Sequence, residues 1–433
     1  MVVVFEQVRL VDHRMDKRGT LVVQDDRIRE ILFQDPIDEG PAIRIDCSGT
    51  DAVLMPAFVD LHAHFRDPGF PEKETLESAS LAAAAGGYGT VVCMANTKPV
   101  IDNLDLAQRL RRRCTELGLI DLYPVLSLTR GMEGRDPGHL DALERKALQD
   151  TVRLLSEDGK DVTEDLVLLK ALTAARRLDL PVSYHCDWGG QQAEEARAAG
   201  KPRSVWSRIE ENCATQRVLA LAAESGASLH IAHVSTKEAI ELIRQAREQS
   251  NPRDFRLTCE VTPHHLACTE SLAERLGAET YGRVNPPLRT DQDVAALIKA
   301  IQEGTVDAIA TDHAPHTDQD KAQGAPGFIG LETAFGASYT ALVARGHISL
   351  RQLSALMSYK PSQILTLHDR GYLAPGAKAD LVLVDCGAEW TVKKEDFRSR
   401  SGNSPFIGQK LQGRVLMTLH NGTIVYDNPR RTK

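Results

Sequence analysis

The feature that most constrains the fold of this chain is a regular alternation of apolar runs with helical segments in its central part. The apolar runs, each long enough for one strand, occupy residues 52–59, 89–94, 122–128, 152–155, 181–184, 228–232, 256–261 and 306–310. Stretches between them, such as 74–85, 106–117, 165–177 and 217–224, have helical periodicity and are rich in Ala, Leu and Glu. Strand followed by helix eight times over about 260 residues predicts an α/β fold, a (β/α)₈ barrel of the TIM type. A doubly wound open sheet is the alternative, but no GxGxxG motif follows any run.

Both ends of the chain have a different pattern, with short strands separated by turns. Such strands are predicted at 2–11, 19–23, 28–32 and 42–46, and again at 379–385, 415–419 and 423–426. Neither end alone has enough apolar strand to fold. We therefore expect residues 1–52 and 366–433 to pair into a small composite β-sandwich domain, with residues 53–365 forming the barrel.

Composition and charge limit the classes of partner. A net charge of −8 argues against nucleic acid or an anionic membrane as the main partner. No run approaches the ~18 apolar residues needed to span a bilayer, and the start lacks the basic stretch of a signal peptide. The eight cysteines form no CxxC pair, which is typical of reduced thiols. These observations predict a cytoplasmic protein that acts on a small molecule.

The sequence Asp60-Leu-His-Ala-His64 ends the first apolar run. Residues two apart on a strand point the same way, so His62 and His64 should project from one face. Two converging imidazoles suit a borderline metal such as zinc. An HxH pair alone is a weak signal, because such pairs also occur on wet surfaces.

Polar residues also follow the later apolar runs, at the strand ends where the active sites of barrels gather. The polar residues that follow the later runs are Asn96, Glu157, Asp158, His185, His233, His264, His265, Asp312 and His313. Imidazole and carboxylate together suit Zn²⁺, or less often Mn²⁺ or Fe²⁺. The constellation therefore predicts a metal site at the mouth of the barrel.

Each of these residues also has a structural interpretation. His185 alone is better read as a core histidine, His233 as the start of a helix, and Asp312 as the cap of a turn. His264 and His265 are adjacent and point to opposite faces, so support of a ligand is favoured over metal binding. The histidines assigned as surface or structural residues are His13, His139, His230, His347, His368 and His420. Taken together, the structural interpretations require several independent coincidences.

The sequence resembles the cyclic amidohydrolases and, within them, the bacterial class I dihydroorotases. The matching segments between Pro56 and Thr333 are PAFVDLHAHFRDPG, MANT, AHVSTKE, TPHHL, NPPLR, ATDHAPHT and GLET. The resemblance implies a zinc-dependent enzyme, with a pair of zinc ions, that reversibly cyclises N-carbamoyl-L-aspartate to dihydroorotate in pyrimidine biosynthesis. It also implies a homodimer and leaves open an association with aspartate transcarbamoylase.

The resemblance assigns His62, His64 and Asp312 to one metal. His185 and His233 are assigned to the second metal, and Asp158 to the carboxylate that bridges the two. Glu157 stands where the family has the first of two aspartates, so it is the bridge if the register is shifted by one residue. Related hydantoinases and allantoinases bridge with a carbamylated lysine, which leaves Lys160 as a third alternative. Asp312 is also assigned as the catalytic group that accepts the proton and returns it to the leaving nitrogen.

By the same resemblance, Arg66, Asn96 and His316 bind the substrate carboxylate, and Asn285 contacts the pyrimidine ring. A guanidinium suits a carboxylate independently, because it can form two parallel hydrogen bonds. The segment that covers the substrate, 325–332, is one residue shorter here than the family's usual form, with Phe and Gly exchanged. The alternative functions are a hydantoinase, dihydropyrimidinase or allantoinase, or an inactive scaffold for aspartate transcarbamoylase.

Overall fold

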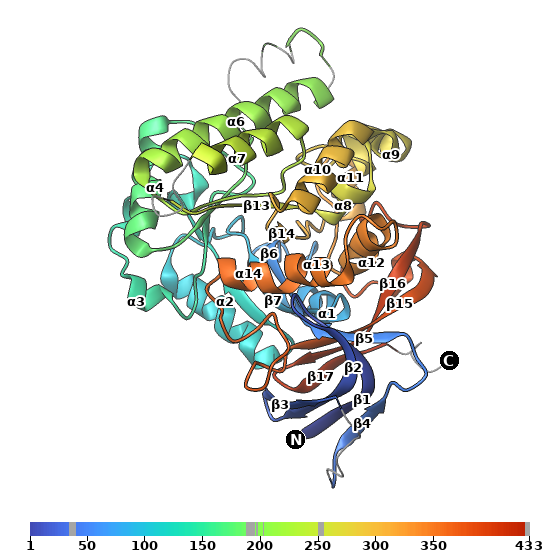
Figure 1. Cartoon of the computed structure of the whole chain (residues 1–433). Helices are drawn as coiled ribbons and strands as arrows, with labels where there is room; N and C mark the ends of the chain where they lie inside the picture. The colour runs from blue at the N-terminus through green and yellow to red at the C-terminus, as the bar shows by residue number, and fades with distance from the viewer. Residues whose placement is uncertain (34–39, 188–194, 196–197, 202, 250–254, 429–433) are drawn as a thin grey trace.

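Strands from both ends of the chain form one eight-stranded sheet. The computed structural model describes residues 1–33, 40–187, 195, 198–201, 203–249 and 255–428. The sheet contains β1 (Val2–Val11), β2 (Asp16–Gln24), β3 (Arg27–Leu32), β4 (Ile43–Asp46), β5 (Ala52–Pro56), β15 (Leu381–Thr391), β16 (Lys410–His420) and β17 (Thr423–Asp427). Its order is β17-β16-β15-β5-β1-β2-β3, with β4 parallel to β1. The N-terminal and C-terminal strands therefore lie side by side, as predicted (Figure 1).

The central part of the chain contains two parallel sheets. One sheet is formed by β6 (Phe58–Ala63), β7 (Tyr88–Cys93) and β8 (Asp121–Pro124). The other contains β9 (Leu126–Ser127), β10 (Leu155–Ser156), β11 (Val182–Tyr184), β12 (Leu229–Ile231), β13 (Leu257–Val261) and β14 (Ala308–Ile309). Val125, between β8 and β9, donates its N–H to Cys93 O in β7 at 3.0 Å, and Ala63 in β6 forms a parallel bridge with His313, which follows β14. Every residue of the strands in both sheets, apart from Asp121, is buried, as expected for parallel strands covered by helices.

The apolar run 52–59, predicted as a single strand of the barrel, is divided between two sheets. Its first part, β5, pairs with β1 and β15 in the terminal sheet, and β6 begins only at Phe58. Both parts are buried and apolar, so hydropathy cannot show where the chain passes from one sheet to the next. The terminal sheet consequently extends beyond residue 52. The run 122–128 is likewise divided into β8 and β9.

Helices follow the strands where periodicity predicts them: α1 (Leu76–Ala85), α2 (Leu104–Leu117), α4 (Asp165–Leu178) and α6 (Arg203–Ser225). Local capping defines several ends. Thr75 begins α1 in a capping box with Ser78, and α2 ends at Gly118, which adopts a left-handed φ of 67°. The remaining α-helices are α3 (Arg145–Leu148), α7 (Lys237–Gln249), α8 (Pro263–Ala267), α9 (Glu270–Leu276), α10 (Asp291–Glu303), α11 (Asp318–Ala322), α12 (Ala334–Ser338), α13 (Leu350–Ser354) and α14 (Lys360–Ile364).

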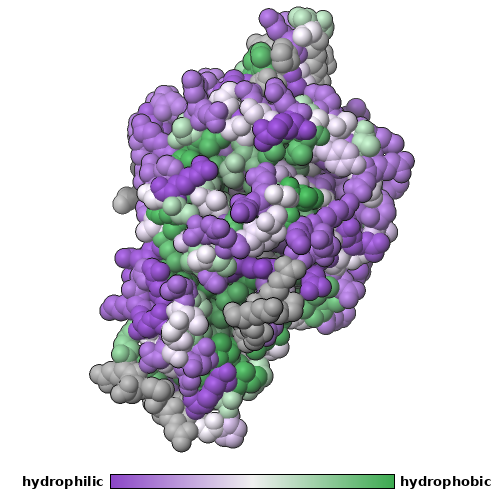
Figure 2. All heavy atoms as spheres, turned by 90° about the vertical axis from the view of Figure 1, so that its right-hand side faces the viewer, coloured by the Kyte–Doolittle hydropathy of each residue, from purple (hydrophilic) through white to green (hydrophobic). Residues whose placement is uncertain are grey.

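The described residues form three apolar cores, of which the third surrounds Phe328 and Phe406. The larger core joins the parallel strands to the helices that cover them, and a smaller one packs against the terminal sheet. On the face shown in Figure 2, hydrophilic residues predominate and apolar residues show in narrow areas between them. Among the described residues, no helix has the length and apolar character needed to cross a membrane.

Candidate active site

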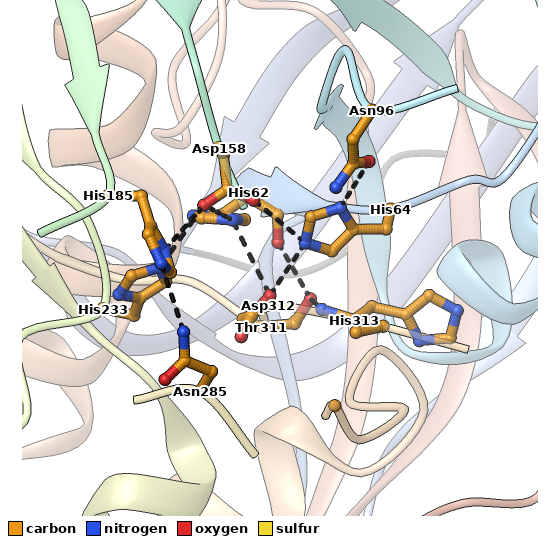
Figure 3. A network of polar contacts seen from close by, with 12 residues as sticks. His62, His64, Asn96, Asp158, His185, His233, Asn285, Thr311, Asp312 and His313 are labelled. Atoms are coloured by element: carbon orange, nitrogen blue, oxygen red, sulfur yellow. Dashed lines mark hydrogen bonds and ion pairs between the residues drawn. The ribbon is translucent and has the colours of Figure 1, made fainter. Parts of the chain in front are cut away.

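Polar side chains from five strand ends converge at one place (Figure 3). His62 lies in β6, and the others follow β6, β10, β11, β12 and β14 within a few residues. The converging side chains are His62, His64, Asp158, His185, His233 and Asp312. All six are at most 5% exposed. The structure thus brings together every residue that the sequence predicts as a metal ligand.

His62, His64 and Asp312 form one group whose donor atoms lie within 4.8 Å of one another. Asp312 Oδ1 is 3.1 Å from His64 Nε2 and 3.6 Å from His62 Nε2. Burial raises the pKa of Asp312, but the hydrogen bond with His64 and the charges of the nearby imidazoles outweigh it and hold the pKa below its usual value. The carboxylate is therefore ionised and can accept a proton.

Asp158 lies between this group and the other two histidines. Its Oδ1 is 3.2 Å from His62 Nε2, 3.2 Å from His185 Nδ1 and 3.4 Å from His233 Nε2, and its Oδ2 is 3.4 Å from His64 Nε2. Burial raises the pKa of Asp158, but the charge of His62 and the hydrogen bonds with the histidines hold it well below its usual range. A carboxylate that adjoins both histidine pairs has the position that a bridge between two metals requires.

Glu157 and Lys160, the two alternatives for the bridging residue, form hydrogen bonds away from the histidines. The Glu157 carboxylate accepts hydrogen bonds from the Thr129 backbone N–H, at 3.0 Å, and from the Thr129 hydroxyl. Lys160 Nζ donates to the Met132 carbonyl at 2.9 Å. Neither side chain lines the cavity described below. Among the three candidates, only Asp158 contacts the histidines in this structure.

A buried relay behind His62 was not predicted from the sequence. Glu260, in β13, accepts from His62 Nδ1 at 2.9 Å and lies 3.0 Å from His230 Nε2. His230 Nδ1 in turn lies 2.8 Å from Thr258 Oγ1. By accepting the Nδ1 proton, Glu260 holds His62 in the tautomer whose Nε2 faces Asp158. A charged residue within the predicted strand 256–261 is the signal that identifies it, because a buried charge needs a partner.

If the cluster binds zinc, as the sequence predicts, Glu260→Gln is expected to weaken that binding about 10–100-fold, the usual effect of losing a residue that orients a metal ligand. Glutamine keeps the shape but lacks the charge that raises the basicity of His62. Titration of the metal-free protein with zinc would measure the change in dissociation constant. Glu241→Gln, which removes a carboxylate that pairs with Arg244 on the surface of α7, is the matched control. Equal zinc affinity in Glu260→Gln and the wild-type protein would contradict this role.

Two further contacts fix β6 and the residue His64 that follows it. The Asp60 carboxylate accepts from the Thr311 N–H at 2.9 Å and from its hydroxyl at 2.6 Å, which ties β6 to the segment after β14. His64 Nδ1 lies 3.0 Å from Asn96 Oδ1, so the imidazole N–H can donate to the amide oxygen. Asn96, predicted as a substrate ligand, therefore also orients His64, and its amide Nδ2 is left to face the cavity.

A cavity of about 220 Å³ opens beside the histidines. Its lining comprises His64, Arg66, Asn96, Asp158, Gly159, His185, His233, Asn285, Asp312, Ala314, His316, Pro326 and Gly327. All four residues predicted to bind substrate are in this set.

The cationic side of the cavity is formed by Arg66 and His316. Burial lowers the pKa of Arg66 to about 10, so its guanidinium stays charged near neutral pH. Burial and the charges of Arg66, Lys73 and Lys321 lower the pKa of His316 to about 3. The neutral ring can donate from Nε2 to the Pro326 carbonyl, 2.9 Å away, while Arg66 Nη2 lies 3.3 Å from the same nitrogen. A guanidinium beside a neutral imidazole forms a ready site for an anion.

Asn285 forms another wall of the cavity, and the tandem histidines His264 and His265 lie outside its lining. Asn285 Nδ2 donates to Asp187 Oδ2 at 2.7 Å and lies 3.3 Å from His185 Nε2. His265 lies outside the group of ligands: its ring nitrogens are 2.8 Å from Thr262 Oγ1 and 3.0 Å from the Pro286 carbonyl. His265 therefore contacts the segment that carries Asn285, and its predicted support of a metal ligand stays a prediction.

His313 follows Asp312 but its side chain points away from the cluster (Figure 3). Its Nδ1 accepts from the Gly330 N–H at 3.1 Å, and its Nε2 lies 3.4 Å from Glu74. His313 thus braces the segment after the last parallel strand and does not face the cavity.

Comparisons with known proteins agree with this geometry. The model of the amidohydrolase family matches residues 53–425. A dihydroorotase from Clostridium botulinum (strain Eklund 17B / Type B) is 38% identical over 426 residues, covering 98% of this chain and 100% of that protein. A dihydroorotase from Staphylococcus epidermidis is 36% identical over 428 residues, covering 96% of each chain.

Solved structures with the same architecture are also found. An L-hydantoinase (dihydropyrimidinase) from Arthrobacter aurescens superposes with a TM-score of 0.88 at 26% identity, covering 98% of this chain and 96% of the other. A dihydropyrimidinase from Brevibacillus agri has a TM-score of 0.85 at 22% identity, covering 99% and 95%. Because the identity to the Brevibacillus agri protein is only 22%, its likeness shows the fold alone.

Proposed function

This chain belongs to the amidohydrolase family, and we propose that it is a dihydroorotase. The proposed reaction is the reversible cyclisation of N-carbamoyl-L-aspartate to dihydroorotate, a step in the formation of pyrimidine nucleotides. The observation that carries the proposal is that one cavity combines the histidine–carboxylate cluster with the guanidinium of Arg66. A cyclic amide with a free carboxylate matches both parts, with the amide at the cluster and the carboxylate at Arg66. The two parallel sheets are proposed to close into a single (β/α)₈ barrel.

The cluster fits zinc. His62 Nε2 is buried and forms no hydrogen bond in the part of the chain that the structure describes, although it faces two carboxylates. Imidazole nitrogens and carboxylate oxygens are the donors that Zn²⁺ takes. We propose that His62, His64 and Asp312 hold one ion, that His185 and His233 hold a second, and that Asp158 is shared. When bound, zinc supplies Lewis-acid polarisation of the amide and activation of water near neutral pH.

The proton transfers are assigned to Asp312. In ring opening, its ionised carboxylate accepts a proton from the attacking water and returns it to the ring nitrogen as the C–N bond breaks. In ring closure, it accepts a proton from the carbamoyl nitrogen and returns it to the departing carboxylate oxygen, which leaves as water after taking a second proton from solvent. The contact between Asp312 and His64 holds the carboxylate in place for both directions.

The substrate carboxylate is assigned to the cationic side of the cavity. Arg66 can form two parallel hydrogen bonds with it, with the Asn96 amide and His316 beside it. Asn285 is placed to contact the ring from the opposite wall. This assignment keeps the free carboxylate away from Asp158 and Asp312, which would repel it.

The alternative functions fit the site less well. A hydantoinase-type function is supported by the overall fold. That function would use a carbamylated lysine as the bridge, but Lys160, which follows β10, donates to the Met132 carbonyl and does not face the histidines. An inactive scaffold does not require a complete set of ligands, and all six are together here. A homodimer and an association with aspartate transcarbamoylase belong to the proposal on the basis of the sequence resemblance alone. A cytoplasmic location belongs to it on the basis of composition and cysteine usage.

Arg66→Met is expected to raise KM for dihydroorotate about a hundredfold, since each charge-assisted hydrogen bond to the carboxylate contributes ~1.5–3 kcal/mol. Dihydrouracil has the same ring without the carboxylate, so its slower hydrolysis should change little. Steady-state kinetics on both substrates would measure the change in KM for dihydroorotate and the change in the rate of dihydrouracil hydrolysis. Arg113→Met, which removes an arginine that pairs with Asp67 outside the cavity, is the control. An equal loss on both substrates would contradict carboxylate recognition by Arg66.

A further inference from the structure

Lys321 is a fully buried lysine immediately behind the cavity wall. It lies on α11, in the segment that follows β14, and none of its side chain is exposed. Its Nζ donates to three backbone carbonyls: Arg283 O at 2.7 Å, Ala325 O at 2.9 Å and Gly327 O at 2.9 Å. The ammonium group also lies 5.2 Å from the centre of the Phe328 ring. Its three protons thus all have backbone acceptors.

The carbonyls that Lys321 binds belong to two segments that line the cavity. Arg283 is two residues before Asn285, and Ala325 and Gly327 flank Pro326. The segments also contact each other directly, because the Gly327 N–H donates to Arg283 O at 3.0 Å. One ammonium group therefore joins the wall that carries Asn285 to the wall that carries Pro326.

The same wall is held from its other side by Asn403, in the chain between β15 and β16. Asn403 Nδ2 donates to Gly327 O at 3.0 Å and to Ala314 O at 2.9 Å. Space is tight here, since a Cβ on Gly327 would lie 2.6 Å from the Ala314 Cβ, and Gly327 has a φ of 139°. A small shift of Gly327 would consequently change the shape of the cavity.

Lysine is rarely buried completely, so its place behind the cavity wall calls for an explanation. Burial, with the positive charges of Arg283 and Arg203, lowers the pKa of Lys321 to about 7. An apolar side chain of similar volume is often tolerated at a buried charged position. Without Lys321, Gly327 O keeps its bond from Asn403 and Arg283 O keeps its bond from Gly327, so only Ala325 O loses the partner described here.

We propose that Lys321 is a positioning residue for substrate binding: its ammonium group fixes the Asn285 and Pro326–Gly327 walls at the separation that the ring and carboxylate require. The inference rests on the proposed function, because the substrate it concerns is dihydroorotate. Lys321 does not line the cavity, so its effect passes through these two walls. This role explains why a lysine is buried in a segment whose other residues are mostly polar and acidic.

The test compares Lys321→Met with the wild-type chain, both loaded with zinc. KM for dihydroorotate is expected to rise about tenfold or more with a smaller change in kcat, because displaced binding groups cost affinity without removing the catalytic carboxylate. Hydrogen exchange at the amides of Ala325, Gly327 and Phe328 should become faster, while zinc content stays unchanged. Lys394→Met is the matched control, since Lys394 pairs with Asp318 on the exposed side of α11.

A purely structural role predicts a different result: a lower melting temperature with KM unchanged for the folded protein. A KM for Lys321→Met within about twofold of wild type would overturn the proposal, because positioned contacts that matter change binding by more than this. If the methionine variant does not fold, Lys321→Gln, which can still donate to two carbonyls, is measured in its place against the same criterion. Lack of turnover by the wild-type protein would contradict the dihydroorotase function instead, so the two failures are distinguishable.

Discussion

Asp312→Asn is expected to reduce kcat for dihydroorotate by about a thousandfold or more, within the range seen when a general acid–base group is removed. Asparagine has the same shape, but it cannot accept the proton of the attacking water. It also removes a negative charge that lies 3.1 Å from His64 Nε2 and 3.6 Å from His62 Nε2. Turnover of the zinc-loaded variant, with zinc content measured on the same sample, would test this.

The matched control is Asp318→Asn, six residues along the chain. Asp318 is exposed and pairs with Lys394 at 2.9 Å, outside the cavity. We expect this control to keep wild-type kcat. An Asp312→Asn protein that binds zinc normally and keeps more than about a tenth of the wild-type kcat would contradict the proton-transfer role, since general acid–base groups contribute more than this.

Asp158→Asn is expected to lower zinc binding from a pair of ions toward one per chain and to reduce kcat about a hundredfold or more, because shared ligands hold both ions of a two-metal site. Asp158 is the only one of the three proposed bridging residues within 3.4 Å of histidines in this structure. Elemental analysis of the purified protein would give the zinc content per chain.

Glu157→Gln and Lys160→Gln are the controls for that experiment. Glu157 bonds to Thr129, so its loss is expected to lower the free energy of unfolding by ~1–3 kcal/mol without loss of zinc. Lys160→Gln should keep both zinc content and kcat. Loss of one zinc ion in Lys160→Gln, with full occupancy in Asp158→Asn, would show that a modified lysine forms the bridge.

The positions of the six candidate metal ligands were predictable because they depend on local sequence. Each lies directly after an apolar run, and strands that run parallel bring their carboxyl ends to one edge. The spacing of His62 and His64 fixes their shared face in the same way. The structure brings all of these side chains together, as the strand ends predict.

The residues that support the site depend on pairing between distant segments, which local patterns do not contain. Glu260 contacts His62 across 198 residues of sequence. Lys321 sits in a polar stretch typical of an exposed helix, and only the packing of 283 and 325–328 around it makes it buried. The passage from β5 to β6 was missed for a related reason, because β5 is defined by its C-terminal partner β15.

The measurement that tests the central claim most directly is the loss of dihydroorotate absorbance on addition of the zinc-loaded protein, with hydantoin, dihydrouracil and allantoin assayed beside it. We predict turnover of dihydroorotate well above the other three substrates, abolished by a chelator and restored by zinc. A folded protein that demonstrably binds zinc and consumes no dihydroorotate would contradict the proposed function.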